Sequence, residues 1–274
     1  MNSRTPISAR KSGYAPVNGL KLYYEIEGDG APLVYIPPAF GHAGLKSFPP
    51  LAENHAVITV DLQGHGRTAD IPERPLSIEQ NASDVVALLA WLGLPKADFF
   101  GESYGASTAV VIAIKYPEAV RRVVAYGGTY GPAQIAHNTA MLRFDLPPAA
   151  DGRSHAFQRD EYKKVAPDPN YWPQIWEKVA RMRWDGLPAD QLASIKSPVL
   201  IIVGDHDFVR VEHAAEAFRH IPLGELAVIP DASHFALASE QEKVIPIIQQ
   251  FLEKPSLRLP LATSEMGDRP GETR

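Results

Sequence analysis

The stretch ADFFGESYGASTAVVIAIKY, residues 97–116, changes its pattern within six residues and decides the fold. It opens with a short apolar run that is typical of a buried strand and continues as a longer apolar run that is typical of a helix. Between the two runs, Ser103 stands between Gly101 and Gly105. Because a tight turn leaves no room for side chains at the two glycine positions, the stretch predicts a sharp strand-to-helix turn that projects the Ser103 hydroxyl.

The segments on either side continue the alternation of strand and helix. Apolar runs without polar alternation at 33–37 and 56–61 indicate strands that are covered on both faces. Residues 77–93 carry a helical apolar face, with Ser77 and Gln80 as a capping-box pair. The sequence therefore predicts an α/β fold with a mostly parallel sheet flanked by helices. Further strands are expected at 21–28, 121–128, 197–205 and 225–230, and further helices at 211–219 and 240–253.

The regular alternation of strands and helices stops at about residue 133 and resumes after residue 196. The stretch between them is longer and has a mixed pattern that favours helices. We interpret this segment, 133–196, as a helical cap inserted into one core, whose two parts are residues 1–132 and 197–274. The residues from 264 onward are polar and contain Gly and Pro, so we expect a loosely held C-terminal tail.

Aromatic residues are concentrated in the expected cap. Trp172 and Trp176 lie on one helical stripe with Ile175 and Val179. The stripe predicts either the packing face of the cap or an apolar substrate pocket, and the sequence favours neither. In the second interpretation Trp172, Trp176, Met141 and Leu142 bind the substrate, together with Phe40 from the core.

Composition and charge exclude several classes of function. The chain has no Cys, which excludes disulfides, thiolate nucleophiles and Cys-based metal sites. Its net charge is −5 with both signs interspersed, so no basic stripe predicts a nucleic-acid partner. No apolar run approaches the roughly 20 residues that cross a bilayer, and the first residues lack the apolar stretch of a secretory signal. We expect a cytoplasmic protein with no membrane partner, and the sequence gives no oligomeric state.

A serine hydroxyl is a poor nucleophile unless a base accepts its proton and a carboxylate orients that base. His234 follows the strand expected at 225–230, so it should emerge at the same sheet edge as Ser103. Asp205 is the last residue of the buried run VLIIVGD, and Asp207 lies in the loop that follows. Either carboxylate can orient His234. Asp205, His206 and Asp207 also resemble metal ligands, but no matching cluster of His or Glu accompanies them, and we expect no metal.

Residues 61–68, DLQGHGRT, reproduce a D-x-x-G-x-G-x-S/T pattern after an early strand. With this pattern and the turn at Ser103, the chain resembles the α/β-hydrolase superfamily over nearly its whole length. The resemblance implies an α/β-hydrolase fold in which Ser103 is the nucleophile, Asp207 rather than Asp205 is the acid and His234 is the base. It implies no cofactor.

One departure from the family pattern affects the oxyanion hole. Where the family usually has His-Gly, this chain has Pro37 and Pro38, whose nitrogens carry no hydrogen and cannot stabilise an oxyanion. The resemblance assigns the two donors to the backbone N–H groups of Ala39 and Tyr104. Phe40 is the alternative first donor, and its ring could line the acyl pocket.

Together these features predict a serine esterase that cleaves a small or medium carboxylic ester, or a lactone, through an acyl-enzyme intermediate. Other reactions on the same scaffold stay open, because fold alone does not fix chemistry. They are carbon–carbon bond hydrolysis, cofactor-free perhydrolysis and the hydroxynitrile lyase reaction. A slow-turnover receptor that closes a cap on a small ligand is a third class.

Overall fold

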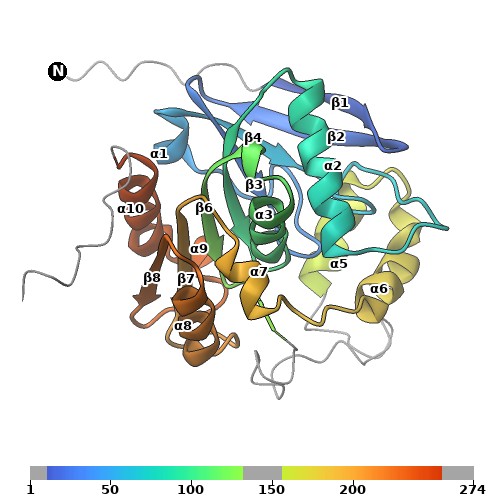
Figure 1. The fold of residues 1–274 in the computed structure, drawn as a ribbon. Coiled ribbons are helices and arrows are strands. Elements are labelled where there is room, and N and C mark those ends of the chain that lie inside the picture. Colours follow the sequence, from blue (N-terminus) through green and yellow to red (C-terminus); the bar gives the residue numbers. More distant parts are fainter. Residues whose placement is uncertain (1–10, 132–155, 255–274) are drawn as a thin grey trace, which may run out of the picture.

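The computed structural model describes residues 11–131 and 156–254, and eight strands of these ranges form one sheet (Figure 1). The strand order is β1-β2-β4-β3-β5-β6-β7-β8, and only the β1–β2 and β2–β4 pairs are antiparallel. This sheet confirms the predicted α/β class. The strands are β1 (Lys11–Val17), β2 (Leu20–Glu27), β3 (Ala31–Ile36), β4 (His55–Val60), β5 (Ala97–Glu102), β6 (Val120–Tyr126), β7 (Val199–Gly204) and β8 (Gly224–Ile229).

Helices cover both faces of the sheet, which explains why the central strands lack polar alternation. One apolar cluster joins one face of the sheet to α2 (Ile78–Trp91), α3 (Tyr104–Lys115) and α8 (Val211–His220). A second cluster joins the other face to α1 (Pro49–Ala52), α9 (Ala236–Ser239) and α10 (Gln241–Leu252). The short helix α7 (Ala189–Ala193) precedes β7.

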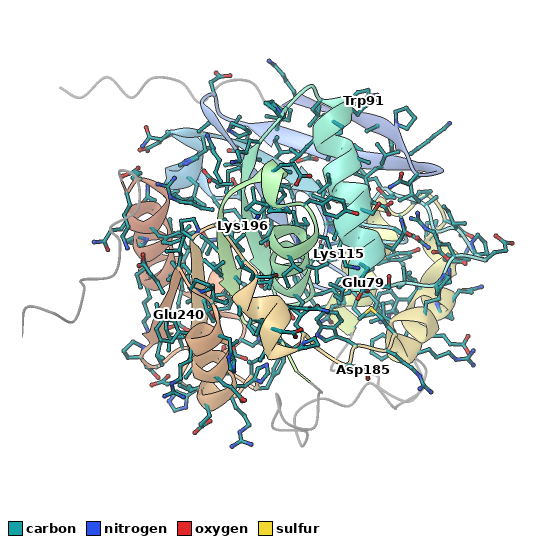
Figure 2. All side chains as sticks on the ribbon, viewed as in Figure 1. Glu79, Trp91, Lys115, Asp185, Lys196 and Glu240 are labelled. Carbon is teal, nitrogen blue, oxygen red and sulfur yellow. The ribbon has the colours of Figure 1, made fainter. Side chains whose placement is uncertain are left out.

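Helix α2 has the predicted beginning, but only half of the expected capping box is present. The Ser77 hydroxyl accepts a 3.0 Å hydrogen bond from the Gln80 backbone N–H. The Gln80 side chain does not return to Ser77, because it donates to Asp84 Oδ1 at 2.9 Å instead. Asp84 is buried and also pairs with Arg74, so the Gln80 amide stabilises a buried charge rather than the helix end. Glu79 and Trp91 mark the two ends of this helix in Figure 2.

In the described residues between β6 and β7, two helices precede α7: α5 (Ala156–Val165) and α6 (Trp172–Arg181), which we call the cap helices. A short 3-10 turn, Pro169–Tyr171, joins them. Met141 and Leu142, two of the expected substrate-binding residues, lie outside the described residues. Within the two described ranges, no helix combines the length and the apolar character needed to span a membrane.

The parallel strands bring four chain segments to one edge of the sheet. Strands β5, β6, β7 and β8 run in the same direction, so their carboxyl ends lie together. Ser103 follows β5 and Gly127 follows β6. Asp207 lies three residues beyond β7, and His234 lies five residues beyond β8. In open parallel sheets, binding and catalytic sites form at this carboxyl edge.

Candidate active site

Ser103 occupies a strained turn between β5 and α3. Its backbone has φ 54° and ψ −113°, a region that non-glycine residues rarely adopt and that costs of order 1–3 kcal/mol. The Ser103 N–H donates a 2.7 Å hydrogen bond to the Tyr126 carbonyl at the end of β6, which fixes the turn. The Ser103 side chain makes no capping bond to α3, so its hydroxyl is not used to satisfy the helix N-terminus.

The two glycines of the turn are required by close backbone contacts. A Cβ atom on Gly101 would lie 2.1 Å from the Gly105 carbonyl oxygen, and one on Gly105 would lie 2.0 Å from the Ile36 carbonyl oxygen. Any side chain at either position would collide with backbone. The Gly105 contact also places the first turn of α3 directly against the end of β3, where the loop containing Ala39 begins.

His234 is held in one orientation by the loop that follows β7 and by the last residue of β6. Its Nδ1 lies 2.8 Å from Asp207 Oδ1, and its side chain is only 7% exposed. The Phe208 ring packs on the imidazole at a centroid distance of 3.8 Å, and the Tyr126 hydroxyl donates to the carbonyl of the preceding Ser233 at 2.7 Å. Because a carboxylate only accepts, Nδ1 carries the proton of the neutral ring, which leaves Nε2 as the acceptor.

The two candidate aspartates occupy different environments. The Asp207 side chain is fully buried, and its Oδ1 accepts from both His234 Nδ1 and the Val209 N–H. The Asp205 side chain is 40% exposed, and its Oδ1 accepts the Ala232 N–H at 3.1 Å. Backbone hydrogen bonds from residues 231 and 232 lower the pKa of Asp205. Asp205 therefore stabilises the loop before His234, whereas Asp207 contacts the ring itself.

Gly127 links the His234 ring to the turn at Ser103. It follows Tyr126, whose carbonyl accepts the Ser103 N–H. A Cβ on Gly127 would lie 2.8 Å from His234 Cε1 and 3.4 Å from Asp207 Oδ2, so both side chains lie against the end of β6. Ser103, His234 and Asp207 thus converge on the ends of adjacent strands, although they are far apart in the chain.

The loop after β3 contains Ala39, the first of the two expected oxyanion donors, and Tyr104 begins α3. Pro38 and Gly41 close a turn through a 2.9 Å hydrogen bond, and Phe40 has φ 62° inside it. A positive φ is uncommon for a large side chain and indicates a constrained loop. Within the described ranges, the N–H groups of Ala39 and Tyr104 donate no hydrogen bond to the protein. Both groups therefore remain free to bind an anionic oxygen.

Asp61 fastens this loop to the following one. It is fully buried, and its two oxygens accept the N–H groups of Ala43 and Arg67. Burial raises the Asp61 pKa to about 7, although these backbone hydrogen bonds lower it. Asp61 and the glycines around it thus have the structural role that local geometry favours.

The aromatic residues of α6 pack against the same loop. The Phe40 ring lies 4.8 Å from the Trp172 ring and is stacked on the Trp176 ring at 5.4 Å. Both tryptophans are only 3% exposed, and with Ile175 they form an apolar cluster with Leu76 and Tyr162. Of the two interpretations left open by the sequence, packing between the cap helices and the core accounts for these contacts.

A polar cluster that sequence reasoning missed binds α6 to the core. Lys178 Nζ donates to Asp70 Oδ2 at 2.7 Å and to the carbonyls of Ile71 and Arg74 at 2.8 and 2.9 Å. The Tyr171 hydroxyl donates to the same Asp70 oxygen. Burial opposes ionisation of Asp70, but hydrogen bonds led by Lys178 hold its pKa below the usual value. Tyr171 and Lys178 are seven residues apart, a spacing that places two residues on the same side of a helix. Their shared partner, Asp70, lies more than a hundred residues earlier, so the sequence did not reveal it.

Among the residues described, no group of three or more His, Asp or Glu side chains is arranged to hold a metal ion. In the segment 205–207, the side chains of Asp205 and His206 are exposed to solvent, whereas that of Asp207 contacts His234.

Comparison with known proteins agrees with this architecture. Human serine hydrolase BPHL is 24% identical over 236 residues, which cover 81% of this chain and 80% of the relative. The Pseudomonas putida 2-hydroxy-6-oxononadienedioate/2-hydroxy-6-oxononatrienedioate hydrolase 2 is 25% identical over 85% of this chain and 92% of its own. Among solved structures, Est816, described as an N-acyl homoserine lactone degrading enzyme, superposes with a TM-score of 0.70 at 25% identity. That match covers 85% of this chain and 98% of Est816.

The fold, the relatives and the sheet-edge site define a hydrolase of α/β fold. The sequence model of the α/β hydrolase family matches residues 30–247, which is most of the chain. The protein belongs to the α/β hydrolase family.

Proposed function

We propose that the protein is a serine hydrolase that cleaves small or medium carboxylic esters or lactones. The observation that carries this proposal is the 2.8 Å contact of His234 Nδ1 with the buried Asp207. Both side chains lie against the end of β6, and the same strand end accepts the N–H of the strained Ser103. This contact orients the imidazole so that Nε2 is the basic atom, as general-base activation of a hydroxyl requires.

The proposed reaction proceeds in two halves. Ser103 Oγ attacks the ester carbonyl while His234 Nε2 takes the hydroxyl proton, and Asp207 stabilises the imidazolium. The carbonyl electrons move to oxygen, where the N–H groups of Ala39 and Tyr104 bind the oxyanion. Collapse breaks the bond to the alcohol, which receives the proton from His234. Water then attacks the acyl-enzyme through the same base and releases the acid and Ser103.

The proposed activity on lactones is supported by the likeness to Est816, which is described as an N-acyl homoserine lactone degrading enzyme. A lactone is a cyclic ester, so the same sequence of steps opens it and keeps the alcohol attached to the acyl group. The Pseudomonas putida relative favours a second candidate, hydrolysis of a carbon–carbon bond in an oxo-dienoate. A panel of p-nitrophenyl esters, lactones and oxo-dienoates ranks the two candidates by kcat/KM.

Replacement of the two serines of the 101–107 segment tests the nucleophile. Ser107 is the matched control, because it lies in the first turns of α3 and is buried. Its hydroxyl donates to the Thr129 carbonyl at 2.9 Å and accepts the Thr129 N–H at 3.2 Å. We expect Ser103→Ala to lose about 10⁴-fold or more in kcat/KM on the best ester. We expect Ser107→Ala to stay within about tenfold, since the two neutral hydrogen bonds that it loses are worth about 1 kcal/mol each. Equal turnover in wild type and Ser103→Ala would refute the proposal.

A further inference from the structure

A buried carboxylate lies directly before the proposed nucleophile. Glu102 ends β5, and its residue is only 2% exposed. It lies on the same face of β5 as Phe100, which belongs to the apolar cluster beneath α1 and α10. The Tyr35 hydroxyl on β3 donates to Glu102 Oε2 at 2.6 Å. A charge in this position is costly unless it is both paired and hydrogen-bonded.

The charge partner of Glu102 comes from the loop that carries the proposed oxyanion donor. Lys46 Nζ lies 2.6 Å from Glu102 Oε2 and also contacts Oε1, and the Lys46 side chain is only 12% exposed. Lys46 belongs to the loop between β3 and α1 and forms a β-bridge with Ala43. Ala43 is itself fixed by Asp61. The ion pair therefore joins the residue before Ser103 to the loop that begins after β3.

The Glu102 charge also acts on Tyr126, the residue at the end of β6. Burial raises the pKa of Tyr126, and the negative charges of Asp207 and Glu102 raise it further. The two carboxylates thus lie near the same phenol, whose hydroxyl holds the carbonyl of Ser233 next to His234. Burial and Glu102 likewise raise the Tyr35 pKa. Within residues 11–131 and 156–254, the charged and titratable groups that interact with Glu102 are Tyr35, Lys46 and Tyr126, and Lys46 is the cation of this set.

We propose that Lys46 is a positioning residue for the acyl transfer, acting through Glu102. It neutralises a carboxylate that would otherwise oppose the negative charge developing on the substrate oxygen, and it holds the Ala39 loop against the Ser103 turn. Electrostatic stabilisation of an oxyanion is sensitive to such charges because a buried site screens them weakly. This inference rests on the function proposed above.

A charge-balanced set of variants separates this role from simple packing. Lys46→Met keeps the length of the side chain and leaves Glu102 unpaired, whereas Lys46→Met with Glu102→Gln removes both charges. At pH 8 we expect Lys46→Met to lower kcat on a p-nitrophenyl ester by about 10- to 100-fold with KM within about threefold. The double variant should recover at least half of the loss on a logarithmic scale. Lys46→Arg, which keeps the charge, should retain kcat within about threefold.

The pH profile gives a readout that a purely structural role would not move. As the pH falls, protonation of the unpaired Glu102 removes its charge, so the kcat deficit of Lys46→Met should shrink toward that of the double variant. The difference between the double variant and wild type should be independent of pH. A structural role predicts the same deficit in both variants at every pH.

Three outcomes overturn the inference. They are a kcat of Lys46→Met within twofold of wild type, a double variant no more active than Lys46→Met, and a deficit that does not change with pH. If Lys46→Met does not fold, the double variant must still fold with a kcat close to that of Glu102→Gln alone, or the inference fails. Turnover that persists in Ser103→Ala refutes the proposed function, whereas an inactive Ser103→Ala with an unimpaired Lys46→Met refutes only this inference.

Discussion

The carboxyl edge of β5 to β8 and the interface of helix α6 with the core are built by different means. At the sheet edge, the backbone determines geometry: Ser103 has a strained conformation, and a side chain on Gly101 or Gly105 would collide with main-chain atoms. At the α6 interface, side chains determine geometry, through stacked rings and the Lys178–Asp70 ion pair. The difference indicates that backbone geometry fixes the sheet edge, whereas side-chain contacts fix the position of α6 on the core.

The largest expected effect lies at the sheet edge and compares the two aspartates after β7. Asp207→Asn keeps the shape but loses the charge that orients His234, and we expect kcat/KM to fall about 10³- to 10⁴-fold. Asp205→Asn alters only a loop hydrogen bond and should stay within about tenfold. Steady-state kinetics on one ester measure both. Equal losses of kcat/KM in the two variants would show that Asp207 has no special role in orienting His234.

The second effect concerns the aromatic packing of α6. Trp176→Ala removes a ring that is 3% exposed and stacked on Phe40, and we expect it to lower the free energy of unfolding by about 3–5 kcal/mol. The control is Phe157→Ala on α5, whose side chain is 61% exposed and should cost less than about 1 kcal/mol. Urea unfolding measures both. An unchanged stability with a raised KM would instead assign Trp176 to a substrate pocket.

A smaller effect tests the polar contact of the same helix. Lys178→Met leaves the buried Asp70 without its cation, and we expect a loss of about 3 kcal/mol of unfolding free energy. Arg181→Met, one turn further along α6, breaks a pair with Glu177 that is exposed on both sides and should change stability by no more than about 0.5 kcal/mol. If the two variants are equally stable, the Asp70 cluster does not hold α6 to the core.

The smallest effect is a pH dependence at the point where the chain leaves β6. His213 Nε2 accepts the Tyr130 N–H at 2.9 Å, so the ring must be neutral at that nitrogen. Burial lowers the His213 pKa, against a smaller effect of Glu216 that raises it. Above the ordinary value of 6.5 this contribution to stability is fully present, and it is lost as the pH falls below 6.5 and through the lowered pKa.

His213→Gln isolates that contribution, because the Gln oxygen can accept the same N–H and does not titrate. Between pH 7.5 and 5, urea unfolding of wild type should lose about 1 kcal/mol more than the variant, the net value of one hydrogen bond. Parallel stability curves would show that His213 does not carry the dependence.

A region can be predicted from the sequence when the residues that determine its structure are close together in the chain. The β5 turn and helix α2 were predictable because Gly101 contacts Gly105 within the same turn and Ser77 caps its own helix. The contact of Gly105 with the distant Ile36 carbonyl reinforces a turn that the local pattern already indicates. Strand β1 escaped notice because Gly13 and Pro16 interrupt its pattern, although it pairs along its length with β2.

The candidate site was only partly predictable, since some of its contacts join distant positions. The residues alone placed Ser103 and His234 at one edge but left Asp205 and Asp207 as alternatives, and the family resemblance favoured Asp207. In the structure, burial and the contact with His234 Nδ1 distinguish Asp207 from Asp205. No local spacing connects Glu102 with Lys46, which are 56 residues apart. The contact of α6 with Phe40 depends on a left-handed backbone that the sequence gives no reason to expect at a phenylalanine.

The most direct test of the account is labelling with a fluorophosphonate, followed by digestion and mass spectrometry of the peptides. An activated serine reacts because its base removes the proton, so we expect a single adduct on the peptide that contains Ser103. We expect labelling to slow by at least about 100-fold in His234→Ala. An adduct on Ser107 or another residue, or labelling of Ser103 at the same rate without His234, would contradict the claim that the sheet edge assembles an activated nucleophile.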